Sequence, residues 1–181
     1  MFLEVGPHAS LAVVAARVGM SQPALSQRFG SKQALLLRAL MPPSTVPWAE
    51  RLADGPGPEP LRDQLEALCV KAMHFFAEMV PAMTALRAAG LPLMDAVALH
   101  PDAPHLRVRR LVVDWFARAM DAGRLRSSDP ERLAMVLIGG LESRALLAWV
   151  QSEPLVADEQ TAHAMAVAEL LWSGVRPETD R

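Results

Sequence analysis

The chain of 181 residues has no tyrosine, a single cysteine and only 5% aromatic residues. One thiol, Cys69, excludes an internal disulfide and is typical of a reducing cytosol. We find no apolar run of the ~18 residues that a membrane-spanning helix needs, and no charged-then-apolar secretion signal. These absences favour a cytoplasmic protein that does not enter a membrane.

Motifs of enzymes are absent too. The chain has no Gly-x-Ser-x-Gly, no phosphate-binding glycine loop and no His-Glu-x-x-His. His100, Asp102 and His105 could ligate zinc or nickel, but two prolines interrupt helical spacing and a further strong ligand is not evident. We therefore expect no metal, no cofactor and no catalysis.

What the chain does contain is apolar residues at helical spacing, with no convincing period-2 alternation, which predicts an all-α fold. Six prolines with Gly55 and Gly57 predict a linker or long loop over residues 42–60. We place a first domain at residues 1–41 and a second at 42–181. The second is expected to have helices at 60–79, from Pro81 to about Gly90, 104–122, 130–151 with a cap at Asp129, and from a cap at Asp158 to about Ser173.

Charge is unevenly divided between these two parts. Residues 1–41 carry four basic side chains and one acidic one, a net +3, whereas the remainder has a net charge of −5. A basic end on an acidic body is expected where one end meets a polyanion.

The N-terminal segment has two short helical patterns joined by a turn. Ser10 can cap a first helix, and Gly19 can end it in the left-handed conformation while Met20 fills the corner. Ser21 can cap a second helix, in which only Leu25 and Phe29 are strongly apolar. The inward face of the first helix is expected to comprise Leu11, Val14, Ala15 and Val18.

The outer face of the second helix is polar. Glutamine and arginine can read adenine and guanine edges, and the amides at helix starts can bind phosphate. Ser31 caps a third helix, Lys32–Leu40, so Lys32 lies beside a positive terminus that suits a phosphate. This layout indicates a helix-turn-helix. The candidate DNA-binding residues are Ser10, Ser21, Gln22, Pro23, Ala24, Ser26, Gln27, Arg28 and Lys32.

Residues 2–40 resemble the N-terminal region of the tetracycline-repressor (TetR) family, in the Phe-Leu-Glu-x-Gly entry, Ala15-Ala16-x-x-Gly19 and Ser31-Lys32-x-Ala34-Leu35. Residues 115–149 are similar to a later region of the family, in particular at Ala122-Gly123-Arg124-Leu125-Arg126 and Asp129-Pro130-Glu131. The resemblance implies a three-helix DNA-binding head, a six-helix ligand-binding and dimerisation body, and a homodimer formed by the last two helices. Two residues depart from the family pattern, Ser26 where tyrosine is usual and Ala24 where threonine is common. Most of the family's first helix would precede Met1.

The resemblance also places a ligand cavity within the body. We expect it to be lined by Met73, Phe76, Met79, Met83, Trp115 and Phe116, although these residues also suit an ordinary core.

Residues 130–151 are apolar on two faces, with Leu133, Val136 and Leu137 on one of them, which favours a dimer. The alternative is a helix central to one monomer. The candidate dimerisation residues are Ile138, Gly139, Leu146, Trp149, Met165 and Trp172.

The sequence therefore predicts a ligand-responsive repressor that binds a palindromic operator in double-stranded DNA as a homodimer and is released by a small apolar effector. The alternative is a helical dimer that no longer binds DNA and instead binds a small molecule or a protein partner.

Overall fold

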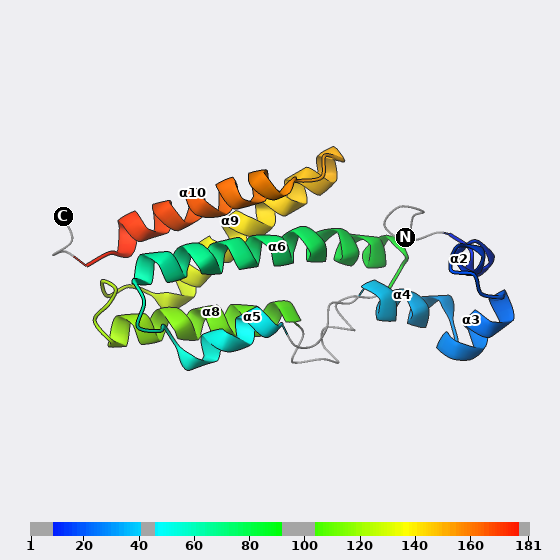
Figure 1. The fold of residues 1–181 in the computed structure, drawn as a ribbon, viewed down its shortest axis with the longest axis horizontal. Helices are drawn as coiled ribbons and strands as arrows, with labels where there is room; N and C mark the ends of the chain where they lie inside the picture. Colours follow the sequence, from blue (N-terminus) through cyan, green and yellow to red (C-terminus); the bar gives the residue numbers. More distant parts are fainter. Residues whose placement is uncertain (1–8, 41–45, 92–103, 178–181) are drawn as a thin grey trace. The chain divides into compact units, whose positions relative to one another are not determined.

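The computed structural model describes residues 9–40, 46–91 and 104–177. Within these ranges the chain forms eight α-helices and one 3₁₀ helix and no strand, so the predicted all-α fold is confirmed (Figure 1). The chain divides into two compact units. The head unit comprises Met1–Pro42 with Met79–Pro101, and the body unit comprises Pro43–Glu78 with Asp102–Arg181. The predicted boundary at residue 41 stays a prediction, because residues 41–45 lie outside the described ranges.

The head unit begins with α2 (Leu11–Arg17), α3 (Gln22–Phe29) and α4 (Lys32–Leu40). Their apolar faces form one core with the last part of α6, in which Leu36 and Leu86 are fully covered. Val18, which we expected in this core, is 45% exposed. The helix ends at Arg17 and the chain turns at Gly19, so helical spacing no longer sets the direction of Val18. The core residues are Val14, Ala15, Leu25, Leu35, Leu36, Leu86 and Leu91.

The proline-rich segment is not wholly a loop. It contains α5 (Pro47–Glu50) followed by the 3₁₀ helix η1 (Arg51–Asp54), so the prediction of an irregular linker over residues 42–60 is wrong for this part. Pro47 occupies the first turn of α5, where proline removes no intrahelical hydrogen bond. The following loop is held from two sides. Gln64 bonds to the main chain of Gly57 and Glu59, and the guanidinium of Arg124 donates to the same two carbonyls.

The long helix α6 (Leu61–Ala88) runs through Pro81 without a break. The two separate helices predicted here are therefore wrong. The residues around the proline, Met79, Val80 and Ala82, are all less than 9% exposed. Packing on both sides of Pro81 therefore offsets the hydrogen bond that it cannot make.

The body unit is completed by α8 (Pro104–Asp121), α9 (Pro130–Gln151) and α10 (Ala157–Val175). The carboxylate of Asp129 caps α9, as its sequence predicts, by accepting hydrogen bonds from the amides of Glu131 and Arg132. Asp158 is not the cap of α10. The helix begins at Ala157, so Val156 occupies the N-cap position. The amide of Val156 donates a hydrogen bond to the side chain of Glu159 at 3.3 Å.

Helix α9 corrects the expectation that no segment is apolar enough to span a membrane, because by length and composition alone this helix could cross one. Its most apolar window has a mean hydropathy of 1.6, and 28% of that window is buried. Such a helix is weak evidence of a membrane span, since core helices of soluble proteins pass the same test. Here α9 packs against α8 and α10, and Leu137 and Leu141 are fully covered. Val136, expected on the same face as Leu137, is 58% exposed.

Candidate nucleic-acid interface and apolar body surface

The candidate DNA-reading helix, α3, is held by the two residues that the sequence identified. Leu25 is 2% exposed in the head core, and the half-buried Phe29 packs against the same core. Gly19 has a φ of +66°, which allows the tight turn from α2, and Met20 packs beside it. The hydrogen bond from the amide of Met20 to the carbonyl of Ala15 closes this turn at 3.0 Å. The turn therefore fixes the direction in which α3 leaves.

The polar residues of α3 lie on its outer side. Gln22, Gln27 and Arg28 are exposed, whereas Ala24 and Ser26 are half-buried. The guanidinium carbon of Arg28 lies 5.6 Å from the centroid of the Phe29 ring, a contact that steadies the side chain without neutralising its charge. Pro23 is also exposed, in the first turn. Donors and acceptors suited to base edges therefore share one accessible surface.

Three serines cap the helices of the head. The hydroxyls of Ser10, Ser21 and Ser31 accept from the main-chain amides of Val13, Ala24 and Ala34 at 3.3, 3.3 and 3.1 Å. Each hydroxyl satisfies one of the four amides that a helix leaves without intrahelical partners, so other amides of the first turn stay open to an anion. Lys32 begins α4 beside the third cap and is half-buried.

The electrostatics of this region favour a polyanion. Residues 9–40 contain Arg17, Arg28, Lys32 and Arg38 and no acidic residue. Every charge that the sequence places in the described part of α2, α3 and α4 is therefore positive, which matches the attraction expected for a phosphate backbone.

The residues predicted to bind a ligand form the interior instead of a surface. Met73 and Phe116 are 0% exposed, Phe76 and Trp115 are 2% exposed, and Met79 is 7% exposed. Met83 is half-buried and packs against the head core. Within the body unit the aromatic rings form edge-to-face pairs, Trp115 with Phe116 at 5.4 Å and Phe75 with Phe76 at 5.3 Å. Their role in binding an effector remains a prediction.

Trp48, an aromatic residue beside this cluster, was not among the candidate ligand-binding residues predicted from the sequence. Trp48 of α5 meets the ring of Phe75 edge-on, with centroids 6.1 Å apart, and both side chains are half-buried. Trp48 lies in the segment expected to be a loop, so no helical pattern linked it to α6. The half-buried pair extends the aromatic cluster toward the surface of the body unit.

Two titratable groups of the body unit have shifted pKa values, the buried Cys69 and the half-buried His105. Burial raises the pKa of the Cys69 thiol from 9.0 to about 12, with a smaller contribution from the charge of Glu66. Burial also lowers the pKa of His105, against the opposing effect of Glu142. In the described ranges, no three His, Cys, Asp or Glu residues are grouped as metal ligands. His100 and Asp102 lie outside those ranges.

An apolar surface covers the outer side of α9. Leu146 and Trp149 are 47% and 43% exposed, and the outward Gly139 has open space where a Cβ would lie. Ile138 is half-buried. Four further apolar residues of α9, not among the candidate dimerisation residues, are at least 49% exposed. They are Met135, Val136, Leu147 and Val150.

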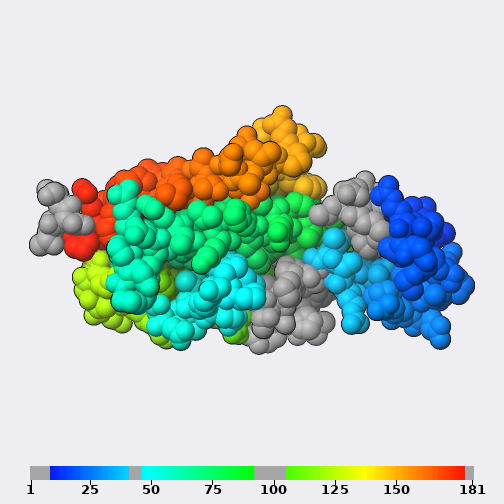
Figure 2. Space-filling view, in the orientation of Figure 1, coloured from blue at the N-terminus to red at the C-terminus, as the bar shows by residue number. Residues whose placement is uncertain are grey.

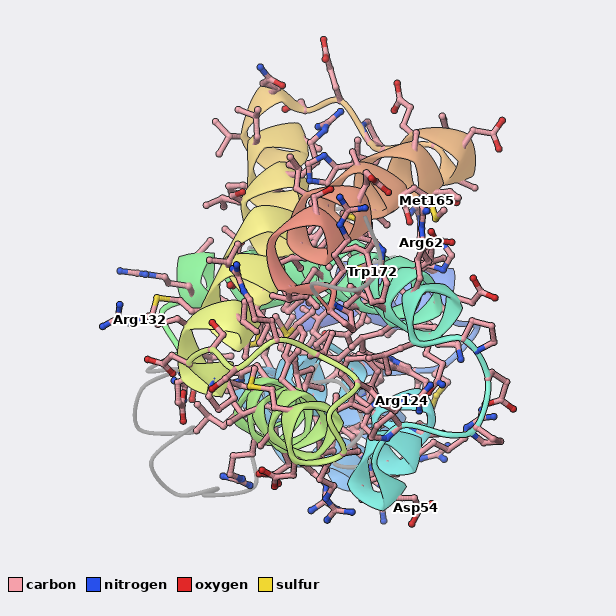
Figure 3. All side chains as sticks on the ribbon, turned by 90° about the vertical axis from the view of Figure 1, so that its left-hand side faces the viewer. Asp54, Arg62, Arg124, Arg132, Met165 and Trp172 are labelled. Atoms are coloured by element: carbon pink, nitrogen blue, oxygen red, sulfur yellow. The ribbon has the colours of Figure 1, made fainter. Side chains whose placement is uncertain are left out.

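Helix α10 packs against α9 along one side, where the ring of His163 lies 3.0 Å from the carbonyl oxygen of Gly140 on α9. Only part of its exposed side can therefore join the apolar surface of α9. Met165 and the half-buried Trp172 lie on the other side, where Arg62 of α6 bonds to Glu169 at 2.6 Å (Figure 3). Leu170 is 77% exposed. The space-filling view shows α10 as an outer ridge of the body (Figure 2).

Comparison with known proteins agrees with this arrangement. Residues 1–39 match the family model described as bacterial regulatory proteins, tetR family. No curated protein sequence gives a significant match to the chain.

Three solved structures share the fold. A TetR family transcriptional regulator from Pseudomonas syringae pv. tomato str. DC3000 has a TM-score of 0.60 at 20% identity, over 97% of this chain and 90% of its own. The flavonoid-responsive regulator FrrA has a TM-score of 0.57 at 19% identity, over 98% and 92%. A TetR-family regulator from Mesorhizobium loti MAFF303099 has a TM-score of 0.56 at 14% identity, over 97% and 91%.

The resemblance expected from the sequence is therefore confirmed: residues 1–39 match the model of the TetR family of bacterial regulatory proteins, and the chain shares the fold of solved TetR-family transcriptional regulators.

Proposed function

We propose that the protein is a homodimeric transcriptional repressor that inserts α3 of each protomer into successive major grooves of a palindromic operator. The observation that carries this proposal is the division of α3 into two sides. Leu25 is almost fully covered, whereas Gln22, Gln27 and Arg28 are all exposed. A helix of eight residues depends on tertiary packing for its stability, so Leu25 anchors α3 and leaves its polar outer side free to meet a partner.

In this proposal the contacts divide into two classes. Gln22, Gln27 and Arg28 read base edges, with Pro23, Ala24 and Ser26 beside them. The open amides after Ser10 and Ser21, together with Lys32, bind phosphates and set the orientation of α3. Because Ser26 and Ala24 are small, we assign most of the affinity to the base-reading residues and to Lys32.

A second copy of the chain covers the apolar surface of α9 and α10. A two-fold interface places the same patch of both protomers, which includes Leu146, Trp149 and Gly139, face to face, and a dimer presents its two recognition helices about one DNA turn apart. Ile138 and the outward part of α10, including Leu170, lie at the edges of this interface. Met165 and Trp172 stay candidates for a lesser part, because they lie toward α6.

The effector is a small apolar molecule that enters the body unit among Met73, Phe76, Trp115 and Phe116, whereas Met79 and Met83, predicted with them, belong to the head unit. Such a molecule lowers operator affinity only if it binds the released form more tightly than the DNA-bound form. Methionine-rich surroundings can adjust to ligands of varied shape.

The test is to select the duplexes that the full chain binds from a pool of random-sequence DNA. Sedimentation of the selected complex then gives the number of chains bound to each duplex. We expect a palindrome whose half-sites are 10–10.5 base pairs apart, or a multiple of that spacing, bound by two chains. Recovery of unrelated sequences with equal affinity would contradict the proposal and would favour a helical dimer that binds other partners.

A further inference from the structure

The middle of α9 contains two consecutive glycines, Gly139 and Gly140. A glycine inside a helix is less stable than an alanine there, because folding costs it more conformational freedom. Neither glycine has a positive φ, so backbone conformation does not require them. A Cβ at Gly139 would have nothing within 4 Å, and a Cβ at Gly140 would meet Val167 of α10 at an ordinary 3.6 Å. Packing within one chain therefore requires neither glycine.

Gly139 differs from Gly140 in its surroundings. Gly140 is half-buried and lies against α10, whereas Gly139 is exposed on the outer side of α9. Met135 lies one turn before Gly139 on this side, and Leu146 lies two turns after it. These two side chains are 60% and 47% exposed, so they border a gap in the surface at Gly139. Such a gap admits a side chain from another helix at close range.

The charges at the two ends of α9 favour one orientation for a second copy of this helix. Arg132 lies near the start of α9, where it pairs with Asp129 of its own chain yet keeps 81% of its side chain exposed. The exposed Glu153 follows the end of the helix. A parallel copy would place each of these charges opposite an identical one, which costs free energy, whereas an antiparallel copy places opposite charges together. The antiparallel order is therefore favoured.

The same charges give the antiparallel pair its register. The midpoint between Arg132 and Glu153 falls between residues 142 and 143. Gly139 and Leu146 are equally far from this midpoint, so an antiparallel copy places each of them opposite the other. In this register a large apolar side chain fills the gap at Gly139. The arrangement is self-complementary, as a two-fold interface requires.

Two further features of α9 agree with this register. Met135 and Val150, which are 60% and 63% exposed, are also equally far from the midpoint and would cover each other. Close to the midpoint, the charge of Glu142 has a neighbour in its own chain: burial lowers the pKa of His105 in α8, and Glu142 opposes that shift. The Glu142 carboxylate therefore lies toward α8, at the edge of the contact.

We propose that Gly139 is the point of closest approach between the α9 helices of two protomers, where it receives the partner's Leu146. This inference rests on the homodimer proposed above and adds the residues that set its register. A larger residue at position 139 would collide with the partner's Leu146. Gly139 thereby determines which chains can pair, since it excludes related chains that have a larger residue there.

Alanine substitutions at the two glycines test the close approach. Gly139→Ala should weaken the dimer about tenfold, because the added methyl group occupies the space of the partner's Leu146. Gly140→Ala is the matched control. It adds the same group to the same helix, on the side that faces α10, and should leave the dissociation constant of the dimer unchanged. Sedimentation with fluorescence detection, over a range of concentrations, measures that constant for both variants and the native chain.

Cross-linking tests the register. In a Cys69→Ala background, chains with Gly139→Cys are mixed with chains with Leu146→Cys and oxidised. A disulfide needs Cα atoms about 4.4–6.8 Å apart, so we expect mixed dimers bonded between positions 139 and 146. Each variant alone should bond more slowly. Faster bonding of position 139 to its own counterpart would overturn the pairing of Gly139 with Leu146.

The outcomes separate this inference from the proposed function. If the native chain dimerises and Gly139→Ala dimerises as tightly, the close approach at Gly139 is wrong and the homodimer stands. If the native chain stays monomeric at every concentration, the homodimer of the proposed function fails and the contact at Gly139 fails with it.

Discussion

Arg107 of α8 donates two hydrogen bonds to the carboxylate of Glu50 in α5, from Nε to Oε1 and from Nη2 to Oε2, both 2.5 Å long. This paired geometry joins the short helix within the proline-rich segment to the first part of α8. The hydrogen bond from Arg107 is the main reason that the pKa of Glu50 lies below its usual value of 4.5.

We therefore expect Glu50→Gln to lower the melting temperature at pH 7 modestly, because both partners are partly exposed. A lowered pKa in the folded chain means that the stabilisation is complete above pH 4.5 and is lost as the pH falls through the folded-state pKa. The difference between Glu50→Gln and the native chain should therefore shrink as the pH is reduced below 4.5. A difference that persists unchanged at pH 2 would show that the ion pair is not its cause.

Leu25→Ala should unfold the head selectively. The substitution removes a side chain that is 2% exposed, and such truncations cost about 2–5 kcal/mol, a large share of the stability of so small a core. Circular dichroism should show a partial loss of helix at low temperature with the main transition retained. Val18→Ala, at a position 45% exposed, is the matched control and should leave both unchanged.

Gln27→Ala and Lys32→Ala should weaken DNA binding in different ways. Loss of Gln27 should reduce discrimination between selected and random duplexes by about 1–3 kcal/mol, because a base-edge contact is lost. Loss of Lys32 should weaken both kinds of duplex alike and lower the log–log salt slope by about 1. Titrations at several salt concentrations measure both quantities. If both variants affect selected and random duplexes equally, the roles assigned to these two residues are wrong.

Leu170→Arg combined with Leu146→Arg should yield monomers. Both side chains are exposed in one chain, at 77% and 47%, and two-fold pairing would bury the introduced charges without partners. Sedimentation velocity distinguishes the two states. Ala67→Arg, at an exposed position on α6, is the control and should stay dimeric. If the double variant dimerises as tightly as the native chain, the apolar surface of α9 and α10 is not the dimer interface.

Cys69 should be inert in the folded chain. Its thiol is fully covered, and its pKa of about 12 leaves almost no thiolate at pH 8. A disulfide reagent such as DTNB should therefore react at the rate of unfolding, and at full speed in denaturant. Rapid reaction of the folded protein would contradict the burial of this residue.

Local chemistry was predicted well from the sequence. Ser10, Ser21, Ser31 and Asp129 cap the helices that they were expected to cap. Gly19 takes the positive φ expected of it. These features depend on neighbours within four residues, so the sequence contains all the information that they require. The polar outer side of α3 was predictable for the same reason, since two apolar anchors, Leu25 and Phe29, determine where the remaining side chains point.

Packing between distant segments decided the rest. A proline alone predicts the end of a helix, yet Pro81 stays inside α6 because the two cores fix the helix on both sides of it. Likewise the sequence shows that α9 is apolar all round, but only its contacts with α8 and α10 decide that Leu137 is covered and Val136 is not. Helical spacing alone determines which residues share a face. Which face is covered is settled by the free energy of burial summed over residues far apart in the chain, and no local pattern records that sum.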